Sequence, residues 1–231
     1  MNQNQQLELS KEKVPLFKFI LIGDQSVGKS SIVKRYKNEE FNYNIKATIG
    51  VEFIKKFVQV DKGLIEIQLW DTAGQEQFRS VIRSFYRGAA AVFIVYSVNL
   101  KESFDQLSIW LNEIEYHAHS EIIKVLVGNK CDLQREVQKE EAESLMNNNN
   151  FSLFFETSAK TGENIDEAFI QTAKLVLLKY FSSDSFRQAT KVNKKSADPI
   201  NIIKSSNKNE SFEGQSPQQQ QHQDSNQSGC C

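Results

Sequence analysis

The 231-residue chain is predicted to fold as an α/β protein: a mainly parallel six-stranded sheet with one antiparallel edge strand and flanking helices. Short apolar runs alternate with amphipathic segments of helical length between residues 16 and 181, the pattern of chains built from βαβ units. Two of these runs, 51–60 and 64–70, are joined by Asp61-Lys62-Gly63. The glycine suits a hairpin turn, so this pair is expected to be antiparallel.

The spacing of the apolar residues assigns each element in chain order. Strands are expected where β-branched and aromatic residues cluster or alternate with polar ones, and helices where apolar residues recur every three or four positions. Residues 65–69 alternate between apolar and polar side chains, as a strand with one exposed face does. The expected strands are 17–22, 51–60, 64–70, 91–96, 122–127 and 153–156, and the expected helices are 31–36, 104–117, 138–147 and 163–179.

Both ends of the chain differ from this central segment. Residues 1–15 are polar and are expected to form a flexible extension, which leaves 16–181 as the folded domain. Residues 182–231 are rich in Ser, Asn, Gln and Lys and contain few apolar side chains. Such a segment cannot bury enough surface to offset the entropy lost on ordering, so we expect a disordered tail.

The composition is that of an ordinary soluble domain, with 39% hydrophobic and 25% charged residues. A formal net charge of -1 gives no reason to expect nucleic acid as a partner. Three cysteines, two of them at the last two positions, do not make a disulfide framework, which favours a reducing, cytosolic compartment. The longest apolar stretch, 89–96, is far below the ~20 residues that span a bilayer, so no transmembrane helix is expected.

One loop predicts a nucleoside triphosphate as ligand. The run Gly23-Asp24-Gln25-Ser26-Val27-Gly28-Lys29-Ser30, followed by Ser31, matches the pattern G-x-x-x-x-G-K-[ST] between an expected strand and an expected helix. Its glycines let consecutive N–H groups and the helix N-terminus point at phosphate. Lys29 is expected to reach the terminal phosphates, and the Ser30 hydroxyl to bind Mg²⁺. A turn made only for packing is the alternative, and the Lys-Ser pair argues against it.

A second group of residues predicts that the phosphate is hydrolysed. Asp71 ends the second hairpin strand, where a carboxylate is expected near Mg²⁺, acting through water. Gly74 would let its N–H approach a γ-phosphate, and Gln75 would orient the attacking water, with Lys29 as the second catalytic residue. The hydroxyl of Thr48, in a polar loop, would complete the Mg²⁺ site when a γ-phosphate is present.

The base is predicted to be guanine. Asn129, Lys130 and Asp132 form the pattern N-K-x-D after an expected buried strand. The carboxylate of Asp132 can accept hydrogen bonds from the ring N–H and the amine of guanine, which adenine does not offer in that arrangement. The turn containing Ser158, Ala159 and Lys160 would donate backbone N–H groups to the guanine oxygen; the alternative is a plain helix cap.

These motifs, in this order, resemble the Ras superfamily of small GTPases and, within it, the Rab family. The Rab resemblance is carried by Ile49-Gly50-Val51-Glu52-Phe53, Leu69-Trp70-Asp71-Thr72-Ala73-Gly74-Gln75-Glu76, Phe85-Tyr86-Arg87-Gly88-Ala89 and the ending Cys230-Cys231. It implies a P-loop NTPase small G domain with Thr48 in switch I, Gln75 in switch II and Phe41 against the guanine. It also implies an effector surface of Ile49, Val51, Phe53, Trp70 and Phe85, in which Phe53, Trp70 and Phe85 are an exposed aromatic triad.

The resemblance further implies a membrane-bound switch in vesicle trafficking. Cys230 and Cys231 would be prenylated, since two lipid chains anchor a protein stably and one does not. The expected partners are effectors, an exchange factor, an activating protein, a GDP-dissociation inhibitor and a prenylation escort. Slow GTP hydrolysis is expected, at the cytosolic face of intracellular membranes. The alternatives are a GTP-binding scaffold that does not cycle, a small GTPase of another family, and an ATP-using P-loop enzyme.

Overall fold

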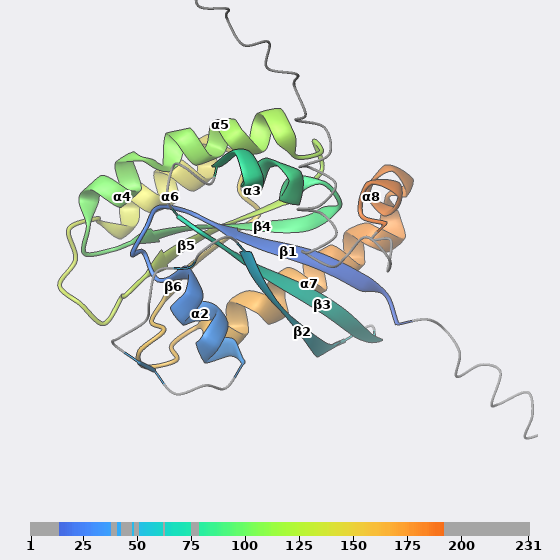
Figure 1. Cartoon of the computed structure of the whole chain (residues 1–231), viewed down its shortest axis with the longest axis horizontal. Coiled ribbons are helices and arrows are strands. Elements are labelled where there is room, and N and C mark those ends of the chain that lie inside the picture. Colours follow the sequence, from blue (N-terminus) through green and yellow to red (C-terminus); the bar gives the residue numbers. More distant parts are fainter. Residues whose placement is uncertain are drawn as a thin grey trace, which may run out of the picture.

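In the computed structural model the chain forms one six-stranded sheet with helices on both faces (Figure 1). The structure describes residues 14–37, 41–42, 48, 51–61, 63–74 and 79–191. The strand order is β2-β3-β1-β4-β5-β6, in which β2 pairs antiparallel with β3 and the other pairs are parallel. The predicted fold class, including its antiparallel edge strand, is therefore confirmed.

Every expected strand is present, with small shifts at the ends. The strands are β1 (Leu16–Ile22), β2 (Val51–Val60), β3 (Gly63–Thr72), β4 (Ala89–Ser97), β5 (Ile123–Asn129) and β6 (Leu153–Thr157). The helices are α2 (Lys29–Tyr36), α3 (Arg79–Tyr86), α4 (Lys101–Asp105), α5 (Leu107–His117), α6 (Lys139–Asn148), α7 (Ile165–Ser182) and α8 (Asp184–Ala189). The single helix expected over 104–117 is divided into α4 and α5 at Gln106, and neither α3 nor α8 was expected.

Two apolar clusters fill the space on either side of the sheet. Because side chains alternate along a strand, Phe17, Phe19 and Leu21 of β1 face one cluster, and Ile20 and Ile22 face the other. Helices α2 and α7 cover the first face, and α3, α5 and α6 cover the second (Figure 1). Strand β4 is buried along its whole length, as expected for a central strand of a mainly parallel sheet.

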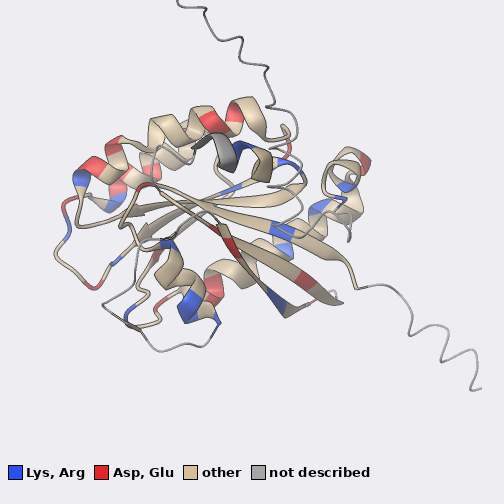
Figure 2. Cartoon of the chain, viewed as in Figure 1, with Lys and Arg blue, Asp and Glu red and all other residues tan. Residues whose placement is uncertain are grey.

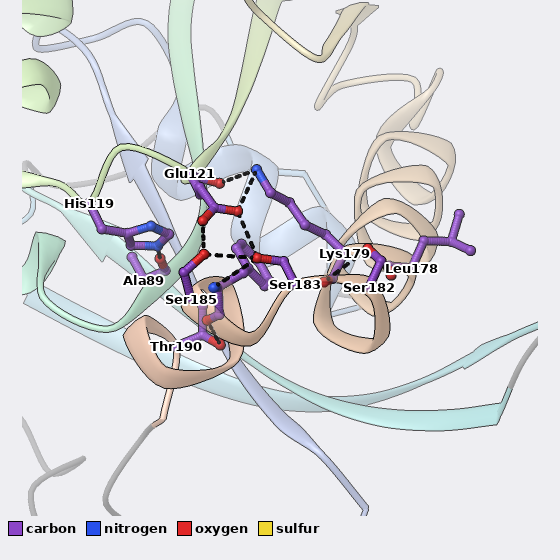
Figure 3. Close-up of polar contacts among 10 residues, drawn as sticks. Ala89, His119, Glu121, Leu178, Lys179, Ser182, Ser183, Ser185 and Thr190 are labelled. Atoms are coloured by element: carbon purple, nitrogen blue, oxygen red, sulfur yellow. Dashed lines mark hydrogen bonds and ion pairs between the residues drawn. The ribbon is translucent and has the colours of Figure 1, made fainter.

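The boundary predicted at residue 181 is wrong, because the folded chain continues as α8. Helix α7 extends to Ser182, and the Phe186 side chain of α8 is fully buried in the cluster that α7 covers. The Ser183 hydroxyl accepts the N–H of Phe186 at 3.1 Å and donates to a carboxylate oxygen of Glu121 at 2.9 Å (Figure 3). The Ser185 hydroxyl donates to the other oxygen of Glu121. The buried Phe186 side chain and these polar contacts hold α8 against the domain. The helix was not predicted because its sequence is too polar to show a helical apolar period.

The predicted extension 1–15 and tail fall mostly outside the described residues, which begin at 14 and end at 191. Within the described part of the chain, no helix is both long and apolar enough to cross a membrane. Among the helices, α2 carries only basic charged residues and α5 only acidic ones, apart from His117, whereas α4, α7 and α8 carry both signs (Figure 2).

Candidate functional site

The loop between β1 and α2 takes a path that requires glycine at two points. Gly23 has a φ of 138° and Gly28 a φ of 99°, conformations that other residues adopt only with strain. A Cβ on Gly23 would overlap the carbonyl oxygen of Val95, and one on Gly28 would overlap the side-chain amide of Asn129. The loop is therefore packed against β4 and β5, and it ends at the N-terminus of α2.

Lys29, in the first turn of α2, lies under this loop with 5% of its surface exposed. Its Nζ donates hydrogen bonds to the carbonyl oxygens of Gly23 and Asp24, each at 2.7 Å. Burial lowers the pKa of the Lys29 ammonium to about 8, and the carboxylates of Asp71 and Asp24 oppose this shift. An anion bound inside the loop would favour the charged form and raise this pKa again.

Three oxygen-bearing side chains from separate segments meet beside Lys29. The Ser30 Oγ lies 2.5 Å from Oδ2 of Asp71 and 2.6 Å from Oγ1 of Thr48, and Thr48 Oγ1 lies 3.4 Å from the same Asp71 oxygen. Burial raises the pKa of the Asp71 carboxyl, opposed by the hydrogen bond from Ser30 and the charge of Lys29. Among the described atoms, the buried Oδ1 of Asp71 has no hydrogen-bond partner. Hard oxygen ligands around an incompletely paired carboxylate fit Mg²⁺.

Asn129, at the end of β5, connects the phosphate loop to the two loops beyond it. Its Nδ2 donates to the carbonyl oxygen of Val27 at 2.9 Å. Its Oδ1 accepts from the Thr157 hydroxyl at 3.2 Å and from the N–H of Ala159 at 3.3 Å. Because all these groups are buried, each contact is made away from competing water.

The predicted base-binding residues are held in a similar way. The Ser158 hydroxyl donates to Oδ1 of Asp132 at 2.6 Å, which fixes the carboxylate while leaving it accessible. Lys130 has a left-handed backbone, with φ of 65°, and burial lowers the pKa of its ammonium. From α2, Arg35 donates to the carbonyl oxygen of Ala159 at 2.8 Å. The base-side turn is thus tied directly to the helix that follows the phosphate loop.

These loops enclose a cavity of about 480 Å³ at the carboxyl ends of the parallel strands. The predicted nucleotide-binding residues that line it are Gln25, Ser26, Gly28, Lys29, Ser30, Ser31, Phe41, Thr48, Gly74, Asn129, Lys130, Asp132, Ala159 and Lys160. The others, Gly23, Asp24, Val27, Asp71 and Ser158, do not line the cavity but each contacts a residue that does. Nearly the whole predicted set is therefore brought together around one cavity.

Three further lining residues, Asn42, Thr72 and Leu133, were not predicted from the sequence. Each directly follows a predicted residue, so its place next to a motif is the feature of the sequence that could have identified it. The predicted residues Gln75, Ile49, Cys230 and Cys231 lie outside the described residues.

The aromatic triad is contiguous, but it is not exposed as expected. Phe53 and Trp70 stack with ring centroids 5.4 Å apart, and Trp70 and Phe85 lie 5.1 Å apart. Trp70 is 1% exposed and Phe85 is fully buried, so the expectation of exposed rings is wrong for both. The reason is that α3 packs Phe85 onto the sheet and Lys18 covers Trp70, with its Nζ 4.4 Å from the ring centroid. Phe53 and Val51 are partly exposed.

A comparison with known protein families agrees with this geometry. The family model described as the Ras family matches residues 18–178. That span is well over half of the chain and includes every described residue that lines the cavity. The chain therefore belongs to the Ras family and is a small GTPase.

Proposed function

We propose that this small GTPase is a Rab-type switch, which binds GTP at the cavity described above and recruits effectors to intracellular membranes. The main observation in support of a GTP-dependent switch is the position of Thr48. Its hydroxyl lies 2.6 Å from Ser30, although the two belong to different segments of the chain. If Thr48 and Ser30 bind the same Mg²⁺, the loop that contains Thr48 can change its conformation when the γ-phosphate is lost.

Each part of the cavity has a role in the proposal. The loop from Gly23 to Ser31 cradles the phosphates, Phe41 and Lys130 flank the guanine, and Asp132 pairs with its N–H groups. Ser30, Thr48 and Asp71 would hold Mg²⁺, with Asp71 acting through water. When bound, the ion neutralises developing charge on the phosphates. Gly74 brings its N–H to the γ-phosphate side of the cavity.

Hydrolysis is proposed to be slow without a partner. Among the described residues that line the cavity, the cations are Lys29, Lys130 and Lys160, and none is an arginine that could serve as a finger in cis. Gln75 is the proposed water-positioning residue, with Lys29 stabilising charge on the phosphates. Activating proteins that supply an arginine accelerate Ras by about 10⁵-fold, and we propose the same dependence here.

The membrane role rests on the Rab resemblance of the sequence. We propose that Cys230 and Cys231 are prenylated, and that effectors engage Val51 and Phe53 with Ile49, over the buried support of Trp70 and Phe85. An exchange factor, an activating protein, a GDP-dissociation inhibitor and a prenylation escort complete the proposed partners. The protein would then cycle between the cytosol and the cytoplasmic face of a vesicle membrane.

Localisation of the full-length chain in cells tests the membrane role. The Cys230→Ser/Cys231→Ser protein is expected to move from membranes to the cytosol, and mass spectrometry of the wild-type C-terminus is expected to find two lipid groups. Cys131→Ser is the matched control, because its thiol donates to Glu163 and is far in sequence from the C-terminus. A membrane fraction that is unchanged in the double variant would refute lipid anchoring.

A single-turnover assay tests the switch. Purified protein loaded with GTP and Mg²⁺ is expected to hydrolyse it slowly, and Gln75→Leu is expected to be slower still. Hydrolysis that is fast in purified protein, or that is insensitive to Gln75→Leu, would contradict the proposed role. Absence of any turnover would favour a GTP-binding scaffold.

A further inference from the structure

Trp110 of α5 makes a polar contact with the phosphate loop that its core position does not explain. Its ring is 1% exposed and belongs to the apolar cluster on the α5 side of the sheet. Its Nε1–H nevertheless donates to Oδ1 of Asp24 at 2.7 Å, across 86 positions of sequence. A hydrogen bond to a carboxylate is among the stronger kinds.

Asp24 lies at the point where three parts of the nucleotide site meet. Its carbonyl oxygen accepts a hydrogen bond from Lys29 Nζ at 2.7 Å. Its peptide group packs against Gly74 so closely that a Cβ on Gly74 would lie 2.5 Å from the carbonyl carbon of Asp24. Movement of Asp24 would therefore disturb both the Lys29 ammonium and the backbone at Gly74.

A carboxylate in this loop poses an electrostatic problem. The loop presents N–H groups and Lys29 to phosphates, and a negative side chain that turned toward them would repel the ligand. The indole N–H of Trp110 gives the Asp24 carboxylate a partner on the side of α5. Since Trp110 is buried and its ring is packed, this partner is held in a fixed position.

We propose that Trp110 is a positioning residue for nucleotide retention: through its hydrogen bond it keeps the Asp24 carboxylate turned toward α5, away from the phosphates. By the same contact it keeps the Asp24 carbonyl on Lys29. Trp110 acts through Asp24 and does not line the cavity. The inference concerns how tightly the small GTPase holds its nucleotide, and it is independent of the membrane role proposed above.

Release of a fluorescent GDP analogue from the full-length protein, in Mg²⁺, tests this role. Trp110→Phe keeps most of the ring and removes the donor, and it is expected to speed release about tenfold, the lower end of the range for a hydrogen bond to a charged group. Tyr96→Phe is the control, because it removes a buried hydroxyl from the same cluster that has no partner among the described atoms. It is expected to stay within about twofold of the wild type.

A double-mutant cycle with Asp24 separates positioning from a general loss of stability. In an Asp24→Ala background, Trp110→Phe is expected to leave the release rate unchanged, because the contact is already absent. In an Asp24→Asn background, where the acceptor is uncharged, its effect is expected to fall to about two- to fivefold. A tenfold effect that persists in the Ala background, or an unchanged rate for Trp110→Phe alone, would overturn the inference. All rates are compared with the release rate of the wild type. Because the assay measures nucleotide release from purified protein, its outcome does not test membrane anchoring.

Discussion

The Ser30 hydroxyl lies 2.5 Å from the Oδ2 of Asp71, which joins the start of α2 to the end of β3. Both oxygens are proposed Mg²⁺ ligands, one direct and one through water. The hydroxyl donates a hydrogen bond to the carboxylate, whose pKa is raised by burial. The contact between them brings the two segments close enough to share the cation that we propose.

Removing this hydroxyl is expected to uncouple nucleotide retention from Mg²⁺. In Ser30→Ala, GDP release should be fast at all Mg²⁺ concentrations, whereas release from the wild type should slow as Mg²⁺ is added. The measurement is the release rate of a fluorescent GDP analogue over a Mg²⁺ titration. Ser108→Ala, which removes an exposed hydroxyl on α5, serves as control and should titrate like the wild type. A normal Mg²⁺ response in Ser30→Ala would exclude Ser30 as a ligand.

Asp132 is expected to decide the choice of base. Asp132→Asn keeps an oxygen for the Ser158 hydroxyl but loses the charge that would pair with guanine N–H groups. GTP affinity is expected to fall about 10- to 100-fold, the range for a hydrogen bond to a charged group, with no gain for ATP. Competition binding with GTP and ATP measures both effects. Asp105→Asn on α4 is the control. Equal GTP affinity in Asp132→Asn and the wild type would contradict the role.

Lys18 is expected to make stability depend on pH. It is 4% exposed beside Trp70, and burial lowers the pKa of its ammonium from 10.5 to about 7. Below pH 7 the folded protein carries a buried charge; between pH 7 and 10.5 it has released a proton that the unfolded chain still holds. The free energy of unfolding attributable to Lys18 therefore rises with pH across this interval.

Lys18→Met removes this dependence. The variant is expected to be more stable than the wild type at pH 6, with an advantage that shrinks toward pH 10, as measured by denaturant unfolding of the GDP-bound proteins. Lys55→Met removes an exposed lysine opposite the same β3 residue, Gln68, and should leave the pH profile unchanged. An advantage that stays constant with pH would mean that Lys18 is charged in the folded protein throughout.

Helix α8 is expected to contribute to the stability of the domain through one side chain. Phe186 is fully buried, so Phe186→Ala should cost about 3–5 kcal/mol and lower the Tm. The matched control is Phe181→Ala, because Phe181 is 63% exposed and its loss should change the Tm little. Thermal unfolding followed by circular dichroism compares the two. Similar Tm values for both variants would show that α8 is not part of the cooperative unit.

The sequence was sufficient to predict the sheet and most of the cavity, for a physical reason. Phosphate binding demands glycines and a lysine at fixed spacing, and central strands must be apolar on both faces, so both leave local patterns. Contacts between distant segments leave none. Phe186 is a single aromatic residue in a polar run, and the burial of Trp70 and Phe85 depends on how α3 and Lys18 pack above them.

Trp110 illustrates the same limit. The apolar period of the helix expected over 104–117 includes Trp110, and its ring is 1% exposed in the structure. Nothing in that period indicates that its Nε1–H reaches the Asp24 carboxylate, because the direction of the indole depends on the packing of α5 against the loop. The sequence therefore predicts the burial of this aromatic side chain but not the hydrogen-bond partner of its polar atom.

Helix α8 and the nucleotide cavity lie at opposite ends of the sheet. The helix contacts Glu121 and His119, which precede β5, whereas the nucleotide cavity lies at the opposite, carboxyl ends of the parallel strands (Figure 3). Helix α8 thus lies at one end of the domain, and the cavity lies at the other. A substitution in α8 therefore acts on the end of the domain that holds the buried Phe186 side chain, and no residue of α8 lines the cavity.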